Sequence, residues 1–373
     1  MSYKFRLYPT KAQEEKLLET LELCRQTYNH FLSQWDGKAK IPRRFELQAQ
    51  LPELKREKPE LNKVYSKVLQ MVLHQLYSNL RSLSQLRMNG KKVGRLRFKG
   101  KGWFKTFVYN QSGFKLVRTG KRLDLLPLSK IGDIPVRLHR YVDGNVKQVV
   151  IKRHNSGKWF ACILVEEATQ IEEKGVKSAV GIDVGIRFFL TDSDGRQIEN
   201  PRFYTESLKS LEIEHKKLSR KKKGSKNWEK QRVRLAEAYE KLVSQRDDFL
   251  HKLSRFYVDT YDLVAVEDLN INGMVRNHGL AGKIQDASWG KFFQMISYKA
   301  ENAGKIVVKV NPRGTSKEYR YGVLERDYNA SLNILERGLS GLGRPSVPVE
   351  MRPLRVIPAS LVVETGNPHQ AVG

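Results

Sequence analysis

Residues 178–195, SAVGIDVGIRFFLTDSDG, decide the fold of the second half of the chain. The apolar run at 179–182 predicts a buried strand, and Asp183 interrupts it with a carboxylate. The following stretch, RFFLTDSDGRQI, predicts a hairpin that turns at Asp194 and Gly195. We therefore expect a separate α/β domain to begin at Ser178.

Helical and strand patterns continue outward from this stretch. Helical periodicity predicts one long helix over 204–261, and an apolar run at 263–266 predicts a strand that ends in Glu267. The remaining expected elements are a helix capped by Ser288, a strand over 305–310 and a helix that opens at Asp327 and stops near Gly338. Residues 339–373 have loop composition, and we expect a disordered tail there.

The first half combines strands with an insertion of helices. Residues 3–8 alternate as a strand, and Thr10 with Gln13 forms a capping-box pattern at the start of an amphipathic helix. A second helical pattern covers 61–86, and we expect the two helices to pack on each other. Short strands after residue 91 predict a small antiparallel sheet or barrel that the N-terminal strand joins. The predicted parts are a β-domain of residues 1–9 and 91–170, inserted helices over 10–90, a polar linker over 170–177 and the domain at 178–338.

The composition indicates a polyanionic partner. The 68 Lys and Arg residues exceed the 40 Asp and Glu residues by 28, and 40% hydrophobic residues suffice for a packed core. We find no apolar run long enough for a membrane span and no signal-peptide pattern, so we expect a soluble, cytoplasmic, prokaryotic protein. Cys24 and Cys162 are too few for a disulfide framework or a four-cysteine zinc module. Motifs of metalloproteases, P-loop NTPases and serine hydrolases do not occur.

Three carboxylates occupy unusual places. Asp183 interrupts one predicted strand, Glu267 ends another, and Asp327 opens a helix. A single carboxylate at such a place is more often a turn former or a helix cap, which is our interpretation of Asp268 and Asp286. Three that a mixed sheet brings together are suited to another purpose, because hydrolysis of a phosphodiester by two divalent cations needs clustered carboxylate oxygens.

Several ordered segments carry a resemblance to a known family. GIDVGIRFFLTDSDG, VAVEDLNINGM and RDYNASLNIL resemble the three RuvC-type nuclease motifs of TnpB, the RNA-guided DNA endonuclease of bacterial and archaeal insertion sequences. The segments YKFRLYPTKAQ, VGRLRFKGKG, LSRKKKGSKNW and DASWGKFFQMISYKA are similar to other recurring parts of that family. The resemblance extends to about Gly338, and the architecture is similar to that of compact type V CRISPR effectors.

The resemblance implies an α+β multidomain protein. Its expected parts are an oligonucleotide-binding-type β-barrel with an inserted helical recognition region and a C-terminal ribonuclease H-like (RuvC) α/β domain. It implies that Asp183, Glu267 and Asp327 are catalytic and hold two Mg²⁺ ions. The implied partners of a monomeric protein are a structured guide RNA from the element's end and double-stranded target DNA beside a short motif.

One segment departs from the family pattern. Members usually carry a CxxC…CxxC zinc ribbon before the third acid, but residues 311–327 contain no cysteine. Residues 319–322 are our candidate for the splice that replaces the ribbon, and we predict no zinc. Side chains that we expect to support the metal site are Arg313, Asn329 and Asn333, whereas Gln75 and Arg246 are candidates for the same role or for nucleic-acid contact.

Two basic stretches are candidates for nucleic-acid binding. A run of charge is usually a solvated helix face, but the surplus of 28 positive charges favours contacts with phosphates here. Residues 91–105 mix cations with Phe98, Trp103 and Phe104, as suits backbone contact with base stacking, and we expect about half of these aromatics to lie in the core. The predicted nucleic-acid-binding residues are Arg95, Arg97, Lys99, Lys101, Trp103, Lys105, Lys216, Lys217, Arg220, Lys221, Lys222, Lys223 and Lys226.

Three functions remain open from the sequence. The leading hypothesis is an RNA-guided, magnesium-dependent DNA endonuclease. The second is an RNA-guided DNA-binding protein that cleaves poorly because the zinc module is missing. The third is a transposase that joins strands through the same acids, which the ordered TnpB motifs disfavour.

Overall fold

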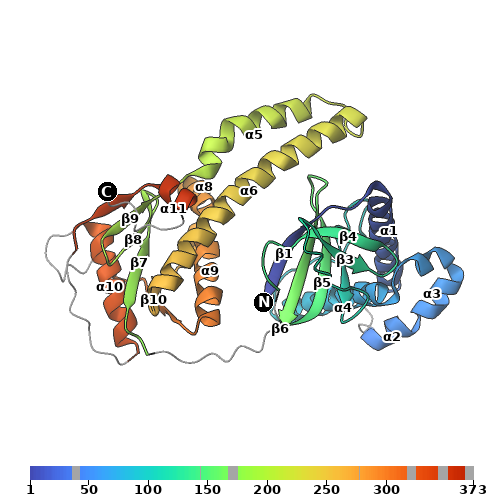
Figure 1. Ribbon diagram of the computed structural model, residues 1–373, viewed down its shortest axis with the longest axis horizontal. Helices are drawn as coiled ribbons and strands as arrows, with labels where there is room; N and C mark the ends of the chain where they lie inside the picture. Colours follow the sequence, from blue (N-terminus) through green and yellow to red (C-terminus); the bar gives the residue numbers. More distant parts are fainter. Residues whose placement is uncertain are drawn as a thin grey trace. The chain divides into compact units, whose positions relative to one another are not determined.

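The computed structural model describes residues 1–35, 43–142, 144–166, 175–276, 278–316, 325–342 and 352–365. The chain divides into two compact units, Met1–Ala168 and Thr169–Gly373 (Figure 1). Residues 170–174 of the predicted linker and the predicted splice at 319–322 lie outside the described residues.

The N-terminal unit is built on a six-stranded antiparallel sheet with the order β2-β5-β6-β1-β4-β3. The prediction that the N-terminal strand joins this sheet is confirmed, because β1 lies between β6 and β4. Residues 114–117 follow β2 and bridge to β3 at Leu128 and Leu125, so the chain joins the two edges of the sheet. The strands are β1 (Ser2–Leu7), β2 (Thr106–Asn110), β3 (Asp124–Leu128), β4 (Gly132–Arg137), β5 (Asn145–Arg153) and β6 (Trp159–Glu166).

Helices fill the sequence between β1 and β2. Thr10 caps α1 through the expected capping box with Gln13, and α1 and α4 contact each other as predicted. Their apolar faces and the sheet share one core, which includes Leu17, Leu73 and Phe107. Two short helices and a 3₁₀ turn between α1 and α4 were not predicted. The elements are α1 (Lys11–Ser33), α2 (Arg44–Ala49), α3 (Leu51–Glu57), η1 (Pro59–Lys63) and α4 (Ser66–Met88).

The C-terminal unit has a mixed six-stranded sheet with the order β11-β10-β7-β8-β9-β12. Strands β7, β10 and β11 are parallel, β8 and β9 form the predicted hairpin, and β12 is parallel to β9. The strands are β7 (Ala179–Val184), β8 (Phe188–Asp192), β9 (Arg196–Glu199), β10 (Leu263–Glu267), β11 (Ile306–Val310) and β12 (Arg355–Ile357).

Helices cover both faces of this sheet. On one face, side chains of α6, α9 and α11 join Val180, Ile182 and Val266 in a core, whereas α10 packs with Leu263 and Ala265 on the other face. This alternation follows from the period of two along each strand. The helices are α5 (Phe203–Ser219), α6 (Lys226–Thr260), α7 (Ile271–Met274), α8 (His278–Ala287), α9 (Trp289–Asn302), α10 (Arg326–Ser340) and α11 (Ala359–Thr365).

The prediction of one long helix over 204–261 is wrong in one respect. The chain turns at 220–225 and forms an antiparallel pair, α5 and α6, that extends from the sheet (Figure 1). Gly224 adopts a φ of +84°, which favours glycine, and the Ser225 hydroxyl accepts from the Trp228 N–H to cap α6. Ser288 also differs from expectation, because its hydroxyl donates to the Gln285 carbonyl oxygen instead of capping α9.

The prediction of a disordered tail is wrong for residues 352–365. Strand β12 extends the sheet at β9, and α11 places Val362 in the core. The Arg352 N–H donates to the Tyr328 hydroxyl at 2.9 Å, which ties this segment to α10. The apolar residues of RVIPASLVV explain the ordering, because they cover an otherwise exposed sheet edge.

Candidate active site

Strand register brings the first two predicted acids to one level of the C-terminal sheet. Parallel pairing matches Gly181 with Ala265 and Ile182 with Val266, so the next step of the register sets Asp183 beside Glu267. The same alternation that points Ala265 toward α10 directs Glu267 to that face, and Asp183 follows Gly181 in the same way. Both carboxylates therefore lie on the α10 side of the sheet, and each residue is only 8% exposed.

Close packing of α10 brings the third acid to the same place. A Cβ on Gly181 would lie 2.1 Å from the Ser331 carbonyl oxygen, so only glycine lets the helix backbone come this near β7. At the start of the helix, Asp327 Oδ2 lies 3.6 Å from the Cβ position of Gly185. The cap of α10 is Glu325, which accepts from the Tyr328 N–H at 3.0 Å, so Asp327 is not needed as a cap.

The electrostatics of the site show that Asp183 is affected by the other two acids. Burial raises the pKa of Asp183 to about 8, and repulsion from Glu267 and Asp327 adds to this shift. Burial also raises the pKa of Glu267, which the hydrogen bond from Thr315 and the positive charge of Arg337 partly oppose. An Asp183 with this pKa keeps a proton at neutral pH until a positive charge replaces it.

The donor set of the site suits a hard divalent cation. It consists of carboxylate oxygens, the ligands that Mg²⁺ and Ca²⁺ prefer, and their mutual repulsion is of the kind that a cation relieves. Among the described residues, no three His, Cys, Asp or Glu side chains are close enough together to hold a metal ion as they stand. The residues present fit a cation by their chemistry, and the side chains do not form a finished coordination shell.

The loop after β11 supports Glu267 in a way that the sequence did not reveal. The Thr315 hydroxyl is buried and donates to Glu267 Oε1, while Asn333 Nδ2 donates to the Thr315 carbonyl oxygen at 2.8 Å. Arg337 Nη1 donates to the carbonyl oxygens of Asn311 and Arg313 at 3.0 and 2.8 Å. Asn333 and Arg337 thus fix the loop to α10, and this places the Thr315 hydroxyl against the Glu267 carboxylate.

The predicted supporting residues divide between this loop and α10. Asn333 contributes through Thr315, Asn329 is fully buried on the same helix, and Arg313 has an exposed side chain whose backbone carbonyl meets Arg337. Gln75 is exposed in the other unit, and Arg246 donates to the Gln285 carbonyl oxygen at 3.4 Å. Asp286 accepts from the Tyr204 N–H at 2.9 Å at the start of α5, which fits its interpretation as a helix cap.

The predicted basic and aromatic segment lies against α1 in the N-terminal unit. Asn29 exchanges two hydrogen bonds with the Lys99 backbone, at 2.8 and 2.9 Å, and Arg25 Nη1 donates to the same carbonyl oxygen. Asn29 and Arg25 therefore fix this segment to α1 through the Lys99 backbone. Phe98 and Trp103 are 62% and 77% exposed, whereas Phe104 is buried.

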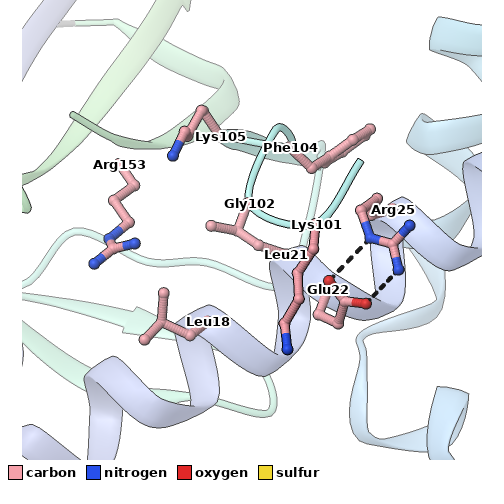
Figure 2. A pocket seen from close by; sticks show the side chains of 9 residues that line it. All are labelled: Leu18, Leu21, Glu22, Arg25, Lys101, Gly102, Phe104, Lys105 and Arg153. Carbon is pink, nitrogen blue, oxygen red and sulfur yellow. Dashed lines mark hydrogen bonds and ion pairs between the residues drawn. The ribbon is translucent and has the colours of Figure 1, made fainter. Parts of the chain in front are cut away.

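A small pocket of about 190 Å³ lies where this segment meets α1 and β5 (Figure 2). Leu18, Leu21 and Phe104 provide apolar walls, and the cations Lys101, Lys105 and Arg153 line it. Glu22 is paired with Arg25 through two hydrogen bonds, which neutralises the acid in this wall. Exposed Arg95 and Arg97, with the exposed rings of Phe98 and Trp103, extend this surface beyond the residues that line the pocket.

The second predicted cluster forms the end of the α5–α6 pair. All seven of its predicted residues are exposed, and they surround the turn between the helices. They are Lys216, Lys217, Arg220, Lys221, Lys222, Lys223 and Lys226. The structure therefore concentrates these charges at one projecting end instead of along a single helix.

Three family models match the chain in succession. The OrfB_IS605 model, described as "Probable transposase", matches residues 162–278, and its associated "Helix-turn-helix domain" matches residues 1–39. The "Cas12f1-like, TNB domain" matches residues 289–334. Where the helix-turn-helix model matches, the described residues form β1 and the single helix α1.

Whole-length relatives carry related names. A Streptomyces pristinaespiralis protein named "Putative RNA-guided DNA endonuclease" is 29% identical over 91% of this chain and 89% of its own length. The Escherichia coli K12 protein "Putative RNA-guided DNA endonuclease InsQ" is 26% identical over 98% of both chains. The protein in the cryo-EM structure of a Cas12f1-sgRNA-target DNA complex has the same fold, with a TM-score of 0.51 and 13% identity over 87% of this chain and 83% of that one.

No helix in the described part of the chain is both long enough and apolar enough to cross a membrane.

The three family matches together span more than half of the sequence, in the same order as the motifs around the three acids. The chain is therefore similar to the TnpB family, which includes the OrfB proteins of IS605-type elements and InsQ.

Proposed function

We propose that this protein is an RNA-guided DNA endonuclease that hydrolyses phosphodiester bonds with Mg²⁺. The observation that carries the proposal is the convergence of Asp183, Glu267 and Asp327 between the sheet and the start of α10, where the first two are buried. The names of the whole-length relatives support RNA guidance and DNA as the substrate.

Asp183, Glu267 and Asp327 are the residues that would hold two Mg²⁺ ions. When bound, such ions activate a water molecule and stabilise the leaving oxygen of a phosphodiester. Other side chains of the protein position the acids. Thr315 orients Glu267 through its hydrogen bond to Oε1, and Arg337 holds the loop that carries Thr315. Asp183 is only 8% exposed, so little bulk water reaches its carboxylate.

The basic surfaces supply the proposed contacts with nucleic acid. Exposed Phe98 and Trp103 can stack on bases, and the cations around them and at the end of the α5–α6 pair can contact phosphates. We propose that the N-terminal unit is an oligonucleotide-binding-type barrel with an inserted helical recognition region, and that the C-terminal unit is RuvC-like. The proposed partners of the monomer are a structured guide RNA and target DNA beside a short motif, in the prokaryotic cytoplasm.

Zinc has no part in this proposal. The two cysteines, Cys24 and Cys162, both belong to the N-terminal unit, and Cys24 is buried in its core. The segment 311–327 offers no thiolate beside the acids. If its shortening weakens delivery of the DNA strand, the protein would bind a matched target and cut it poorly.

Cleavage of a matched target tests the proposal. The protein is purified with its RNA, the RNA is sequenced, and DNA that contains the matching sequence is incubated with the complex and Mg²⁺. We expect cleavage by the wild type and a loss of about a thousandfold or more in Asp183→Ala and Glu267→Ala, with binding retained.

Asp259→Asn is the matched control, because Asp259 is an exposed acid of the same unit that pairs only at the surface with Arg255. Equal cutting by all variants would refute the site assignment. Tight guide-dependent binding with no product at any divalent ion would instead establish the binding protein, and strand-transfer products would establish the transposase.

A further inference from the structure

A second cavity opens directly beside Glu267. It has a volume of about 320 Å³ and lies between the loop after β10 and the exposed side of α9. This volume is at the lower end of the range of small-ligand sites, about 300–1,000 Å³. We propose that the cavity holds one unpaired nucleobase of the DNA strand being cut, and that Gln294 determines which base is preferred. This inference rests on the proposed nuclease function.

The walls of the cavity suit a flat, largely apolar ring. Leu269, Ile271 and Phe293 provide apolar surface, and Phe293 is mostly buried and therefore held in place. A base stacks on aromatic and aliphatic side chains without regard to its identity, with a strength typical of single-stranded DNA sites. The cavity lies on the α9 side of the sheet at the end of β10, whereas the Glu267 carboxylate faces α10, so a base in it belongs to a nucleotide that passes the end of β10 and not to the one that carries the reacting phosphate.

The charges of the cavity disfavour a phosphate as its occupant. Glu267 and Asp268 both line it, and its one cation, Lys309, lies 3.6 Å from Asp268 Oδ1. Lys309 is thus engaged by Asp268, and the described residues of the lining offer a phosphate no other cation. A neutral base needs no cation, and its amino groups are donors that the acids favour.

Gln294 is the group in the lining that can read a base edge. Its side chain is exposed on α9 and makes no hydrogen bond to any other described residue. The nearby Ser297 hydroxyl, by contrast, already donates to the Phe293 carbonyl oxygen at 2.9 Å. A free carboxamide offers a donor beside an acceptor, the arrangement that pairs with base edges in two hydrogen bonds.

Gly290 keeps the cavity open one helical turn before Gln294. A Cβ at this position would lie 3.7 Å from Ile271 Cδ1, an ordinary contact, so alanine fits and a longer side chain would enter the cavity. Gly290→Leu is therefore a blocking variant. The matched control is Gly282→Leu on α8, because a Cβ on Gly282 has no atom within 4 Å.

The experiment maps cut sites on many targets. The complex with its copurified RNA, and complexes reprogrammed with other guide sequences, are given matched DNA panels in which the nucleotides around the cut vary. For the wild type we expect a preference of about fivefold or more at one fixed offset from the cut. Gln294→Ala should flatten it, and Gln294→Glu should shift it toward adenine and cytosine, whose amino groups donate to a carboxylate.

Blocking the cavity tests its occupancy independently of base identity. Gly290→Leu should slow cleavage by about tenfold while Gly282→Leu cuts at the wild-type rate. Identical base distributions for the wild type and both Gln294 variants, or unimpaired cutting by Gly290→Leu, would overturn the inference. Absence of cleavage by the wild type itself would show that the proposed function has failed, which is a separate result.

Discussion

The acidic centre of the C-terminal unit and the basic segment at 91–105 of the N-terminal unit are organised in opposite ways. In the acidic centre the side chains are buried, and strand register, helix packing and a supporting hydroxyl fix their positions. In the basic segment the backbone is fixed at Lys99 by Arg25 and Asn29, whereas most of the side chains are exposed. One site is built from a few interdependent groups, and the other presents many independent ones.

This difference predicts how each region responds to substitution. A buried carboxylate loses its solvation and depends on its neighbours, so one change affects the whole site. Exposed cations and aromatics act additively through phosphates and stacked bases, so each change has a modest and separable effect.

Asp183→Asn should stabilise the metal-free protein, increasingly as the pH rises. The unfolded aspartate ionises at its ordinary pKa of 3.8, whereas burial keeps the folded group protonated up to a pKa of about 8. The folded state therefore binds more protons between these values, and the wild type loses stability with rising pH up to about 8. The asparagine variant lacks this loss, so its advantage should grow by at most about 1.4 kcal/mol per pH unit.

Urea unfolding in EDTA between pH 5 and pH 9 measures this advantage. Above about pH 8 the difference should stop growing, because both states of the wild type are then ionised. Asp259→Asn, which changes an exposed acid, should follow the wild type throughout. Parallel stability curves for Asp183→Asn and the wild type would show that Asp183 is not held in its protonated form.

Thr315→Val should lower cleavage by about 10- to 100-fold, the usual cost of removing a group that orients a metal-binding carboxylate. Because the Thr315 hydroxyl lowers the pKa of Glu267, its loss should also move the pH profile of cleavage upward and raise the Mg²⁺ concentration required. Thr315→Ser, which keeps the hydroxyl, should restore both. An unchanged pH profile in Thr315→Val would make the role of Thr315 purely structural.

Thr315 also marks the limit of what the sequence revealed about the acidic centre. Strand patterns with carboxylates at their ends located Asp183 and Glu267, and the structure brings both to one level through a parallel register. The role of Thr315 depends on contacts across 48 residues, from β10 to a loop without periodicity, so no local pattern identifies it. The available signal was the loop sequence NPRGTS, a polar stretch between a predicted strand and the third acid.

The basic segment shows a different limit. Composition located residues 91–105 correctly as a mixture of cations and aromatics, but it did not separate exposed rings from buried ones. Phe104 is buried in the core with β2 and α1, whereas its direct neighbour Trp103 and Phe98 are exposed, and composition does not distinguish them. The same limit explains the missed order at 352–365, where burial against β9 outweighs loop-like composition.

Trp103→Ala should weaken nucleic-acid binding by about tenfold, since one stacked base contributes about 1–3 kcal/mol. Its ring is 77% exposed, so the thermal stability of the protein should not change. Phe104→Ala should do the reverse, with a loss of roughly 3 kcal/mol in stability because it empties a core position. Fluorescence anisotropy with the copurified RNA, together with thermal unfolding, separates the two. Equal loss of stability in both variants would contradict the exposed position of Trp103.

Lys222→Ala should have the smallest effect, about a twofold to threefold rise in Kd for nucleic acid at moderate salt. Lys222 lies at the turn between α5 and α6 among six other exposed cations, so its neighbours retain most of the local potential. Its distinctive signature is the salt dependence: each lost phosphate contact reduces the slope of log K against log salt by about 0.9. Lys241→Ala, an exposed cation in the middle of α6, changes the net charge equally and should leave the slope unchanged. If both variants alter the slope by the same amount, the end of the helical pair contributes only general charge, and phosphates are not bound there.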